Sequence, residues 1–434
     1  MEWKLPPYVL EALNALEKQG KRAYLIGGAV RDHLLGRPIH DYDVGTDATT
    51  EEIASAFQKE GIHAALLHHG TVLAHFGEKE VEVTPFRGDD PHSLESDLIH
   101  RDFTVNAIAY SPREGFLDPL GGREDLRQKL LRSYSPKESF GEDPLRILRG
   151  VRLEGELGFS LEPHTAVMMR KMAKQVLFSA PERIGEELAK ILVLPRSDER
   201  IREHLPLFLL LFPELSPCVG FDQHSSHHQF DVLEHSLHAL RFMKVRSAPC
   251  CYAAFFHDVA KPRCFFLEGG EGHFYGHDKE GAKILRNVLT RYRYGKDFIE
   301  EACFLVEHHM FQIEKRKTLK RYLRDYGEKR MNELFALREA DVRACSEGNS
   351  RAKKTPYLEA LRRETVSILN EKAPLSLKDL SIHGDDLKAI GMAPGPRMGE
   401  ILKELWEEVL DEKIPNEKKA LLERAEELSK EGGQ

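Results

Sequence analysis

The segment from Leu25 to Thr46, LIGGAVRDHLLGRPIHDYDVGT, gathers side chains that suit phosphate and metal chemistry. Asp41 and Asp43 stand one residue apart, so on a strand their carboxylates project from the same face. Two carboxylates that close repel each other unless a cation lies between them, and Mg²⁺ is commonly held by carboxylates together with substrate phosphates. A turn followed by a solvated strand end is the alternative that this pattern leaves open.

Four further residues fit the same chemistry. Gly27 and Gly28 end a strand just before a helix, where free backbone N–H groups can bind phosphate, and Arg31 lies one turn further on. Glu82, between two apolar neighbours in VEVTPF, is the candidate third carboxylate, with an ordinary exposed glutamate as the alternative. Together these residues predict a two-metal nucleotidyl transfer, in which the ions activate a hydroxyl and stabilise the leaving pyrophosphate.

A mixed α/β framework must position these residues. Hydrophobic periodicity predicts alternating short strands and helices in the first 135 residues, and mostly amphipathic helices from about residue 136 onward. We therefore predict an α+β multidomain protein with four parts: a head (1–135), a helical neck (136–220), a histidine-rich domain (221–345) and a helical tail (346–434). Within the head, the expected elements are helices over 9–18, 29–36 and 49–61, and strands over 23–28, 39–46, 71–76 and 80–86.

The composition indicates a folded globular protein, because 41% of its 434 residues are hydrophobic and 31% are charged. Its net charge of −8 excludes a globally basic nucleic-acid binder, so any such surface must be local. We see no secretory signal, and the apolar run over 205–215 is too short to cross a bilayer and predicts a buried helix. The six cysteines form no CxxC pair, which favours a reduced, cytoplasmic setting with no membrane partner.

Five motifs then follow one another: LIGGAVRDHLLGRPIHDYDVGT, HRDFTVNAIAY, LDPLGGREDL, EDPLRILRGVRL and PERIGEELAKIL. In this order they resemble the successive motifs of class II tRNA nucleotidyltransferases, the polymerase-beta-like family of CCA-adding enzymes and bacterial poly(A) polymerases. The resemblance covers roughly residues 20–195. It implies a polymerase-beta-like head that transfers nucleotides to the 3′ end of tRNA, with Asp41 and Asp43 holding the catalytic Mg²⁺ ions.

The resemblance implies further roles: ribose recognition by Arg101, Asp102 and Asn106, and base reading by Glu142, Asp143 and Arg146. The chemistry agrees, because residues three apart share a helical face, and an Asp–Arg pair can imitate a base edge. Asp143 would accept from the exocyclic amine that cytosine and adenine share. Arg149 and Arg152 continue this face and suit contacts with the triphosphate, while a solvated arginine stripe is the alternative.

The sequence departs from the family pattern at three places. His100 stands where the family commonly has an arginine, and Leu153 stands where it commonly has a phenylalanine. The leucine indicates a change in packing. The flexible basic loop that CCA-adding members carry before the RDFT motif shrinks here to about GDDPH. Within the family a short loop marks enzymes that add CC and stop. We therefore predict a CC-adding enzyme using CTP, with a separate A-adding enzyme; the alternative is a complete CCA-adding enzyme that also uses ATP. Poly(A) polymerase is disfavoured by the pI of about 6.3 and the lack of a long basic tail.

The segments HQFDVLEHSLHAL, AAFFHDVAKP, FYGHDKEGA, FLVEHHMF and LREADV resemble an HD phosphohydrolase domain. The implied metal ligands are His235, His257, Asp258, His277 and Asp341, together with either His308 or His309. Of the last two, His308 is taken as the ligand. Neutral imidazoles with bridging carboxylates hold one or two divalent transition metals beside an attacking water. A phosphohydrolase acting on RNA ends, whose head only presents the RNA, is an alternative function; a structural helix bundle is the other alternative.

Two tail features stay open. The basic stretch over 314–330 can track an RNA backbone or form a solvated helix face. The turn GMAPGPRMG can present N–H groups to a phosphate or simply connect two helices.

Overall fold

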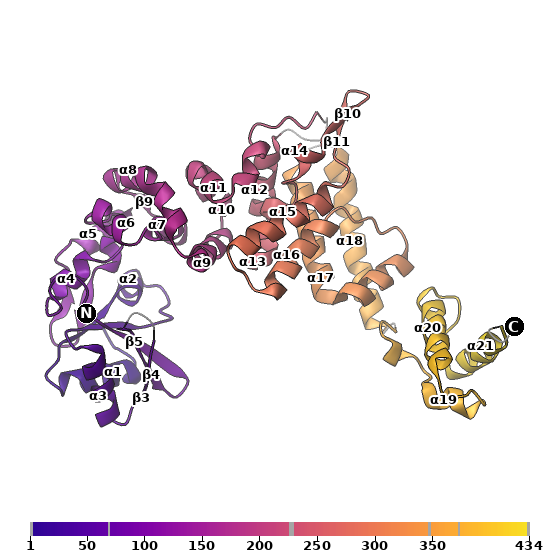
Figure 1. Ribbon diagram of the computed structural model, residues 1–434, viewed down its shortest axis with the longest axis horizontal. Coiled ribbons are helices and arrows are strands. Elements are labelled where there is room, and N and C mark those ends of the chain that lie inside the picture. Colours follow the sequence, from indigo (N-terminus) through magenta and orange to yellow (C-terminus); the bar gives the residue numbers. More distant parts are fainter. Residues whose placement is uncertain (1–2, 68–69, 225–229, 346–348, 372–373, 432–434) are drawn as a thin grey trace. The chain divides into compact units, whose positions relative to one another are not determined.

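The computed structural model describes residues 3–67, 70–224, 230–345, 349–371 and 374–431, in two compact units over 1–211 and 212–434 (Figure 1). The predicted α+β class is confirmed, whereas the finer four-part division stays a prediction. Among the described helices, none is long and apolar enough to cross a membrane.

The first unit is built on a seven-stranded mixed sheet with the strand order β3-β4-β5-β2-β1-β6-β7. β2 and β5 are parallel, and the other neighbouring strands are antiparallel. The strands are β1 (Ala23–Ile26), β2 (Asp43–Thr46), β3 (His63–Leu66), β4 (Val72–Phe76), β5 (Lys79–Pro85), β6 (Ala109–Ser111) and β7 (Gly115–Leu117). The strand predicted over 39–46 is thus shorter than expected, since it begins only at Asp43.

Helices α1 (Pro7–Glu17) and α3 (Thr50–Lys59) pack on this sheet, and α2 (Gly28–Leu34) follows β1 directly. The Thr49 hydroxyl accepts from the Glu52 N–H, and the Glu52 carboxylate accepts from the Thr49 N–H, so a capping box begins α3. Val81 and Val83 are fully buried beneath these helices, so Glu82 between them projects from the opposite face of β5.

Helix α4 (Leu94–Ile99) lies between β5 and β6, and helices predominate after β7, as predicted. These later helices are α5 (Gly122–Gln128), α6 (Pro136–Glu142), α7 (Arg146–Leu157), α8 (Pro163–Met172), α9 (Pro181–Leu192), α10 (Ser197–Glu203) and α11 (Leu205–Leu211), with a small parallel pair β8 (Leu130–Leu131) and β9 (Ser160–Leu161). The apolar run over 205–215 contributes α11, whose Leu207, Phe208 and Leu211 are buried as expected.

The residues that the structure describes in the second unit form helices and one β-hairpin. This unit contains α12 (Val232–Phe242), α13 (Ala248–Phe256), α14 (Lys261–Cys264), β10 (Phe266–Glu268), β11 (Glu271–His273), α15 (His277–Arg291), α16 (Lys296–His308), α17 (Arg316–Ala344), α18 (Asn349–Asn370), α19 (Gly384–Ala389), α20 (Pro396–Leu410) and α21 (Lys418–Glu431). Gly327, with φ of 77°, divides α17 into two helical parts. The segment GMAPGPRMG forms the turn that leads into α20.

Several cations of the basic stretch over 314–330 are ion-paired inside the second unit. Arg321 Nη2 lies 2.9 Å from Asp411 Oδ1, and Lys320 Nζ lies 2.7 Å from Glu412 Oε1. Arg324 pairs with Glu407 and stacks its guanidinium over the Trp406 ring. These contacts fasten α17 to α20, so this part of the stretch stabilises the tail and its charge is largely neutralised locally.

Candidate functional site

Two carboxylates lie side by side at the start of the parallel pair β2 and β5. Asp43 pairs in register with Glu82, so both side chains leave the same face of the sheet. Burial raises the pKa of Asp43, and the charge of Asp41 adds to this effect while Arg101 opposes it. Burial and the charges of Asp43 and Asp41 raise the pKa of Glu82. A divalent cation would relieve this repulsion, so the donor set fits Mg²⁺.

The turn from β1 into α2 approaches these carboxylates closely. Gly27 has a φ of 76°, and a Cβ atom there would lie 3.4 Å from Asp43 Oδ2 and 3.5 Å from Arg101 Nη1. A side chain at position 27 would therefore be strained and would narrow the space beside the metal-binding carboxylate. Gly28 is the first residue of α2.

A cavity of about 350 Å³ opens beside these residues. Seven of the predicted site residues line it: Asp43, Glu82, Arg101, Asp102, Asp143, Arg146 and Arg149. Seven others do not: Gly27, Gly28, Arg31, Asp41, Asn106, Glu142 and Arg152. Two further arginines, Arg87 and Arg183, line the cavity and were not predicted as site residues. Arg87 stands in the motif TPFR and Arg183 in PERI, and their positive charge was the signal that could have identified them.

Two of the three predicted ribose-reading residues, Asp102 and Asn106, lie in one hydrogen-bonded chain, whereas the third, Arg101, pairs with Asp97. Arg31 Nη1 donates to Asn106 Oδ1 at 2.8 Å, and Asn106 Nδ2 donates to Asp102 Oδ1 at 3.0 Å. Arg149 Nε completes the chain by donating to Asp102 Oδ2 at 2.8 Å. Burial alone would raise the pKa of Asp102, but Arg149 and the hydrogen bond from Asn106 hold it well below its usual range. Arg31 thus supports Asn106 instead of reaching the cavity where a phosphate would lie.

The predicted single helical face for base reading is wrong. Asp143 has an extended backbone at the end of α6, and Arg146 begins the separate helix α7. Arg146 folds back, its Nη1 donating to Ser139 Oγ at 2.9 Å and its Nη2 to the His100 carbonyl at 2.7 Å. The two residues still line one cavity because the chain turns between the helices.

Arg183 of α9 is the principal side-chain partner of Asp143. Its Nη2 donates to Asp143 Oδ2 at 2.7 Å, and its side chain remains half-exposed in the cavity. Arg152, by contrast, pairs with Glu156 and Glu187 at 2.7 Å each. The prediction that Arg152 extends an arginine face into the site is therefore wrong, because two carboxylates outside the cavity hold it.

The shortened connection between β5 and α4 is anchored at its beginning, whereas residues 87–92 are exposed. The Arg87 N–H donates to Asp97 Oδ1 at 3.1 Å, and the Arg101 guanidinium donates to Asp97 Oδ2. Gly88 has a φ of 97°, and a Cβ atom there would lie 2.3 Å from Ser96 Oγ and 2.6 Å from His100 Nδ1. Only glycine fits at this point, so the connection is fixed against α4 with Arg87 directed into the cavity.

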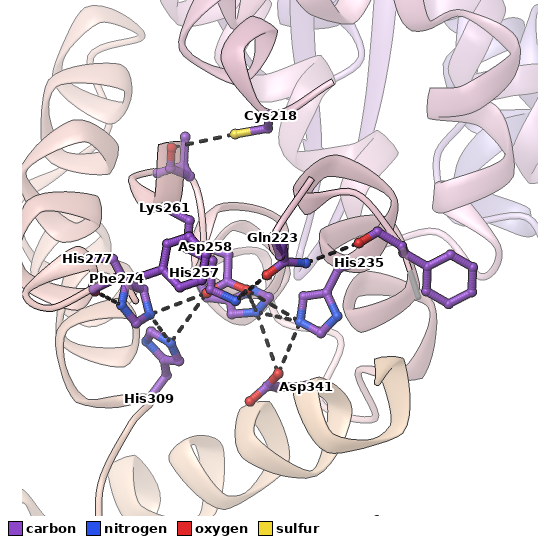
Figure 2. A network of polar contacts seen from close by, with 12 residues as sticks. Cys218, Gln223, His235, His257, Asp258, Lys261, Phe274, His277, His309 and Asp341 are labelled. Atoms are coloured by element: carbon purple, nitrogen blue, oxygen red, sulfur yellow. Dashed lines mark hydrogen bonds and ion pairs between the residues drawn. The ribbon is translucent and has the colours of Figure 1, made fainter. Parts of the chain in front are cut away.

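The second unit brings together five of the six predicted metal ligands, including Asp258, and His309 takes the place of His308 (Figure 2). Asp258 Oδ2 lies 3.4 Å from His235 Nε2 and 3.2 Å from His257 Nε2, and Asp341 Oδ1 lies 3.1 Å from His235 Nε2. Asp258 Oδ1 lies 3.4 Å from His277 Nε2 and 3.8 Å from His309 Nε2. One carboxylate therefore joins two groups of nitrogen donors.

The histidine orientations favour metal binding. The Nδ1 atoms of His257, His277 and His309 each lie 2.7–2.9 Å from the backbone carbonyl three residues earlier. Because Nδ1 donates there, Nε2 is left with its lone pair toward the cluster. Burial lowers the pKa of His309 to about 3, with the neighbouring His257 adding to the effect, so its imidazole is neutral. Such converging lone pairs fit a pair of divalent transition metals.

The choice of His308 as a ligand is wrong. His308 packs against Phe304 and Tyr326 in tilted ring contacts, with ring centroids 4.5 Å and 5.2 Å away, whereas His309 is 1% exposed and faces Asp258. His309 keeps helical backbone angles at the end of α16 and continues its buried face at Ala302, Leu305 and Val306, whereas His308 lies outside that face.

Two cations fix the carboxylates of this cluster. Lys261 Nζ lies 2.7 Å from Asp258 Oδ2 and donates to Gln223 Oε1, and Arg338 Nη1 lies 2.6 Å from Asp341 Oδ2. Neither cation was predicted from the sequence, because a single Lys or Arg near a histidine motif has no distinctive spacing.

Comparisons with known proteins agree with this architecture. Residues 23–132 match the Poly A polymerase head domain, and residues 279–425 match tRNA nucleotidyltransferase domain 2. The chain is 34% identical to an A-adding tRNA nucleotidyltransferase of Deinococcus radiodurans, over 89% of this chain and 91% of that protein. It is also 34% identical to a CC-adding tRNA nucleotidyltransferase of Thermus thermophilus, over 92% of each.

A solved structure of the Bacillus stearothermophilus CCA-adding enzyme in complex with CTP covers 98% of both chains, with 25% identity and a TM-score of 0.69. The predicted family and enzyme class are thereby confirmed. This chain belongs to the tRNA nucleotidyltransferases, the divalent-metal enzymes that rebuild the CCA end of tRNA.

Proposed function

We propose that this enzyme transfers cytidines from CTP to the 3′ end of tRNA and stops after CC, leaving the final adenosine to a separate A-adding enzyme. The relatives named above add A, CC or CCA, so family membership alone does not choose among these products. The observation that carries the proposal is the short connection between β5 and α4.

A change from reading C to reading A requires the base pocket to change shape. The connection between β5 and α4 is too short to reach far over the pocket, and its beginning is held because Gly88 packs against Ser96 and His100 and the Arg87 N–H is bound to Asp97. A pocket of one shape suits repeated use of one base, and we assign cytosine because a short connection at this place marks the CC-adding members of the family.

The residues in and beside the cavity divide the work of the transfer. Asp41, Asp43 and Glu82 would hold Mg²⁺, which supplies activation of the 3′-hydroxyl and charge stabilisation of the leaving pyrophosphate when bound. Arg87, Arg101 and Arg149 surround the cavity with positive charge for a triphosphate. Asp143, held by Arg183, offers a carboxylate to the amine of cytosine.

Primer extension tests this proposal. Three tRNA transcripts, ending at the discriminator base, at C and at CC, are incubated with Mg²⁺ and with CTP, ATP or both. We expect the first two to stop at CC and the third to ignore ATP, and Asp43→Asn to abolish extension. Full CCA on all three transcripts would overturn the CC-only proposal, as would addition of A alone to the CC transcript. A long ATP-only ladder would favour poly(A) polymerase instead.

A second candidate activity is hydrolysis of a phosphate ester at an RNA end by the second unit. It is favoured by Asp258, whose two oxygens face two separate groups of histidines, an arrangement suited to two metals. Bound metal would supply an activated water, while Lys261 and Arg338 would hold the ligating carboxylates in place. The test measures release of phosphate or opening of a 2′,3′-cyclic phosphate in the presence of Mn²⁺ or Ni²⁺. This hydrolysis should persist in Asp43→Asn and be lost in His257→Ala.

A further inference from the structure

The hairpin formed by β10 and β11 has two aromatic faces with different surroundings. Phe266 pairs across the ladder with His273, and Tyr275 lies two residues beyond His273. The ring centroids of Phe266 and His273 are 5.4 Å apart and those of His273 and Tyr275 are 5.7 Å apart, with interplanar angles of 25° and 16°. Phe266 is 39% exposed and Tyr275 is 73% exposed. We call these three side chains the outer aromatic face.

The inner face of the hairpin is anchored to the metal cluster. The Phe274 ring packs on Phe265, whose ring meets that of Phe221, and the Phe274 carbonyl lies 2.7 Å from His277 Nδ1. A Cβ atom on Gly272 would lie 2.2 Å from the Gln223 carbonyl, so the hairpin sits directly on the preceding segment. The outer aromatic face is therefore carried on a support that also orients a metal ligand.

We propose that the outer aromatic face is a stacking platform for unpaired nucleobases of an RNA 3′ end whose terminal phosphate reaches the metal cluster. This inference rests on the second candidate activity proposed above. Each ring of Phe266 and Tyr275 is nearly parallel to His273, and the two are tilted by 34° to one another. Exposed aromatic rings match base stacking, which is sequence-tolerant because every base has a π-face. Tyr275 precedes the ligand His277 by two residues, so their Cα atoms are at most about 7 Å apart.

The charges on the hairpin give the bound strand a direction. Glu268 and Glu271 pair at the tip, on the same face as the aromatic rings. Two adjacent carboxylates repel phosphates, so the backbone of an RNA strand is directed away from the tip and toward the cluster end. The bases just upstream of the reacting nucleotide are the ones that then meet the rings. An unpaired tRNA 3′ end, the substrate class of this family, has this form.

The experiment compares Tyr275→Ala and Phe266→Ala with Leu267→Ala in the full chain. Leu267 is 57% exposed on the same hairpin but alternates to the other face, so it is a matched control. The probes are a pyrimidine tetranucleotide ending in a 2′,3′-cyclic phosphate and the mononucleotide 2′,3′-cyclic CMP, both with Mn²⁺. We expect the preference in kcat/KM for the tetranucleotide over the mononucleotide to fall about tenfold in each aromatic variant, mainly through KM, and to persist in the control.

Binding of the fluorescein-labelled tetranucleotide, measured by anisotropy in an Asp43→Asn background, separates the two proposals. If the wild-type second unit hydrolyses neither probe, the hydrolase proposal fails, and the platform is then judged by whether Tyr275→Ala weakens binding about tenfold. Equal tetranucleotide preference and affinity in all variants would overturn the platform. A change in oligomeric mass with unchanged RNA affinity would also overturn it, by making this face a protein interface.

Discussion

Two neighbouring histidines of FLVEHHMF provide a sharp test of the second metal centre. His309 Nε2 lies 3.3 Å from His277 Nε2 and 3.8 Å from Asp258 Oδ1, whereas His308 packs against Phe304 outside the cluster. We expect His309→Ala to remove one bound divalent ion per chain and His308→Ala to remove none. Both changes delete an imidazole from adjacent positions, so composition and local helix propensity are matched.

The magnitude follows from the ligand count. Asp258, His277 and His309 form one group of donors, and Asp258 with His235 and His257 forms the other. Since losing even an outer partner of a ligand costs about 10–100-fold in metal affinity, losing one of three direct ligands should cost more than about 100-fold. Occupancy of the first group should then collapse at micromolar free metal. The second group keeps all of its ligands.

Metal content after equilibration with buffered free Mn²⁺, measured by mass spectrometry, is the assay. The stoichiometry should fall from about two to about one per chain in His309→Ala, and further in Asp258→Ala, which removes the shared carboxylate. Loss of metal in His308→Ala with retention in His309→Ala would refute the geometric reasoning. Thermal unfolding with and without metal separates ligand loss from misfolding, because bound metal raises the stability only of a folded site.

Three predictions concern the head. Asp102→Asn leaves its arginine partner without a carboxylate and should lower the free energy of unfolding by about 3 kcal/mol. Glu124→Gln, at an exposed ion pair, should leave the free energy of unfolding unchanged. The fluorescence of the buried head tryptophan reports the unfolding of both variants once the second tryptophan is replaced by phenylalanine. Because the folded-state pKa of Asp102 is depressed, this contribution is complete above about pH 4 and is lost as the pH falls through the folded-state pKa, so wild type and variant should converge only in acid. Asp43→Asn should lower kcat for CMP transfer more than about 1,000-fold while CTP binding by equilibrium dialysis persists. Arg183→Ala should relax the choice of C over other nucleotides about tenfold without unfolding the head, because it frees the Asp143 carboxylate to turn; unchanged selectivity would contradict that role.

The sequence alone determined the family, the enzyme class, the mixed head and the helical remainder. These depend on signals within a few residues of each other: the spacing of Asp41 and Asp43, the alternation around Glu82, and the Thr49 capping box. Within one helix or strand, hydrogen bonds and buried positions repeat with the period of that element. The order of residue types along the chain therefore predicts the element.

Only the tertiary structure decided which side chains meet. The register of β2 on β5 places Glu82 beside Asp43, and a turn between two helices puts Asp143 against Arg183 instead of beside Arg146. The inward position of His309 continues the buried face of α16 at Ala302, Leu305 and Val306, so the helical period itself could have chosen it over His308. The other partners lie far apart in sequence, so no local period encodes them; packing of whole elements sets them.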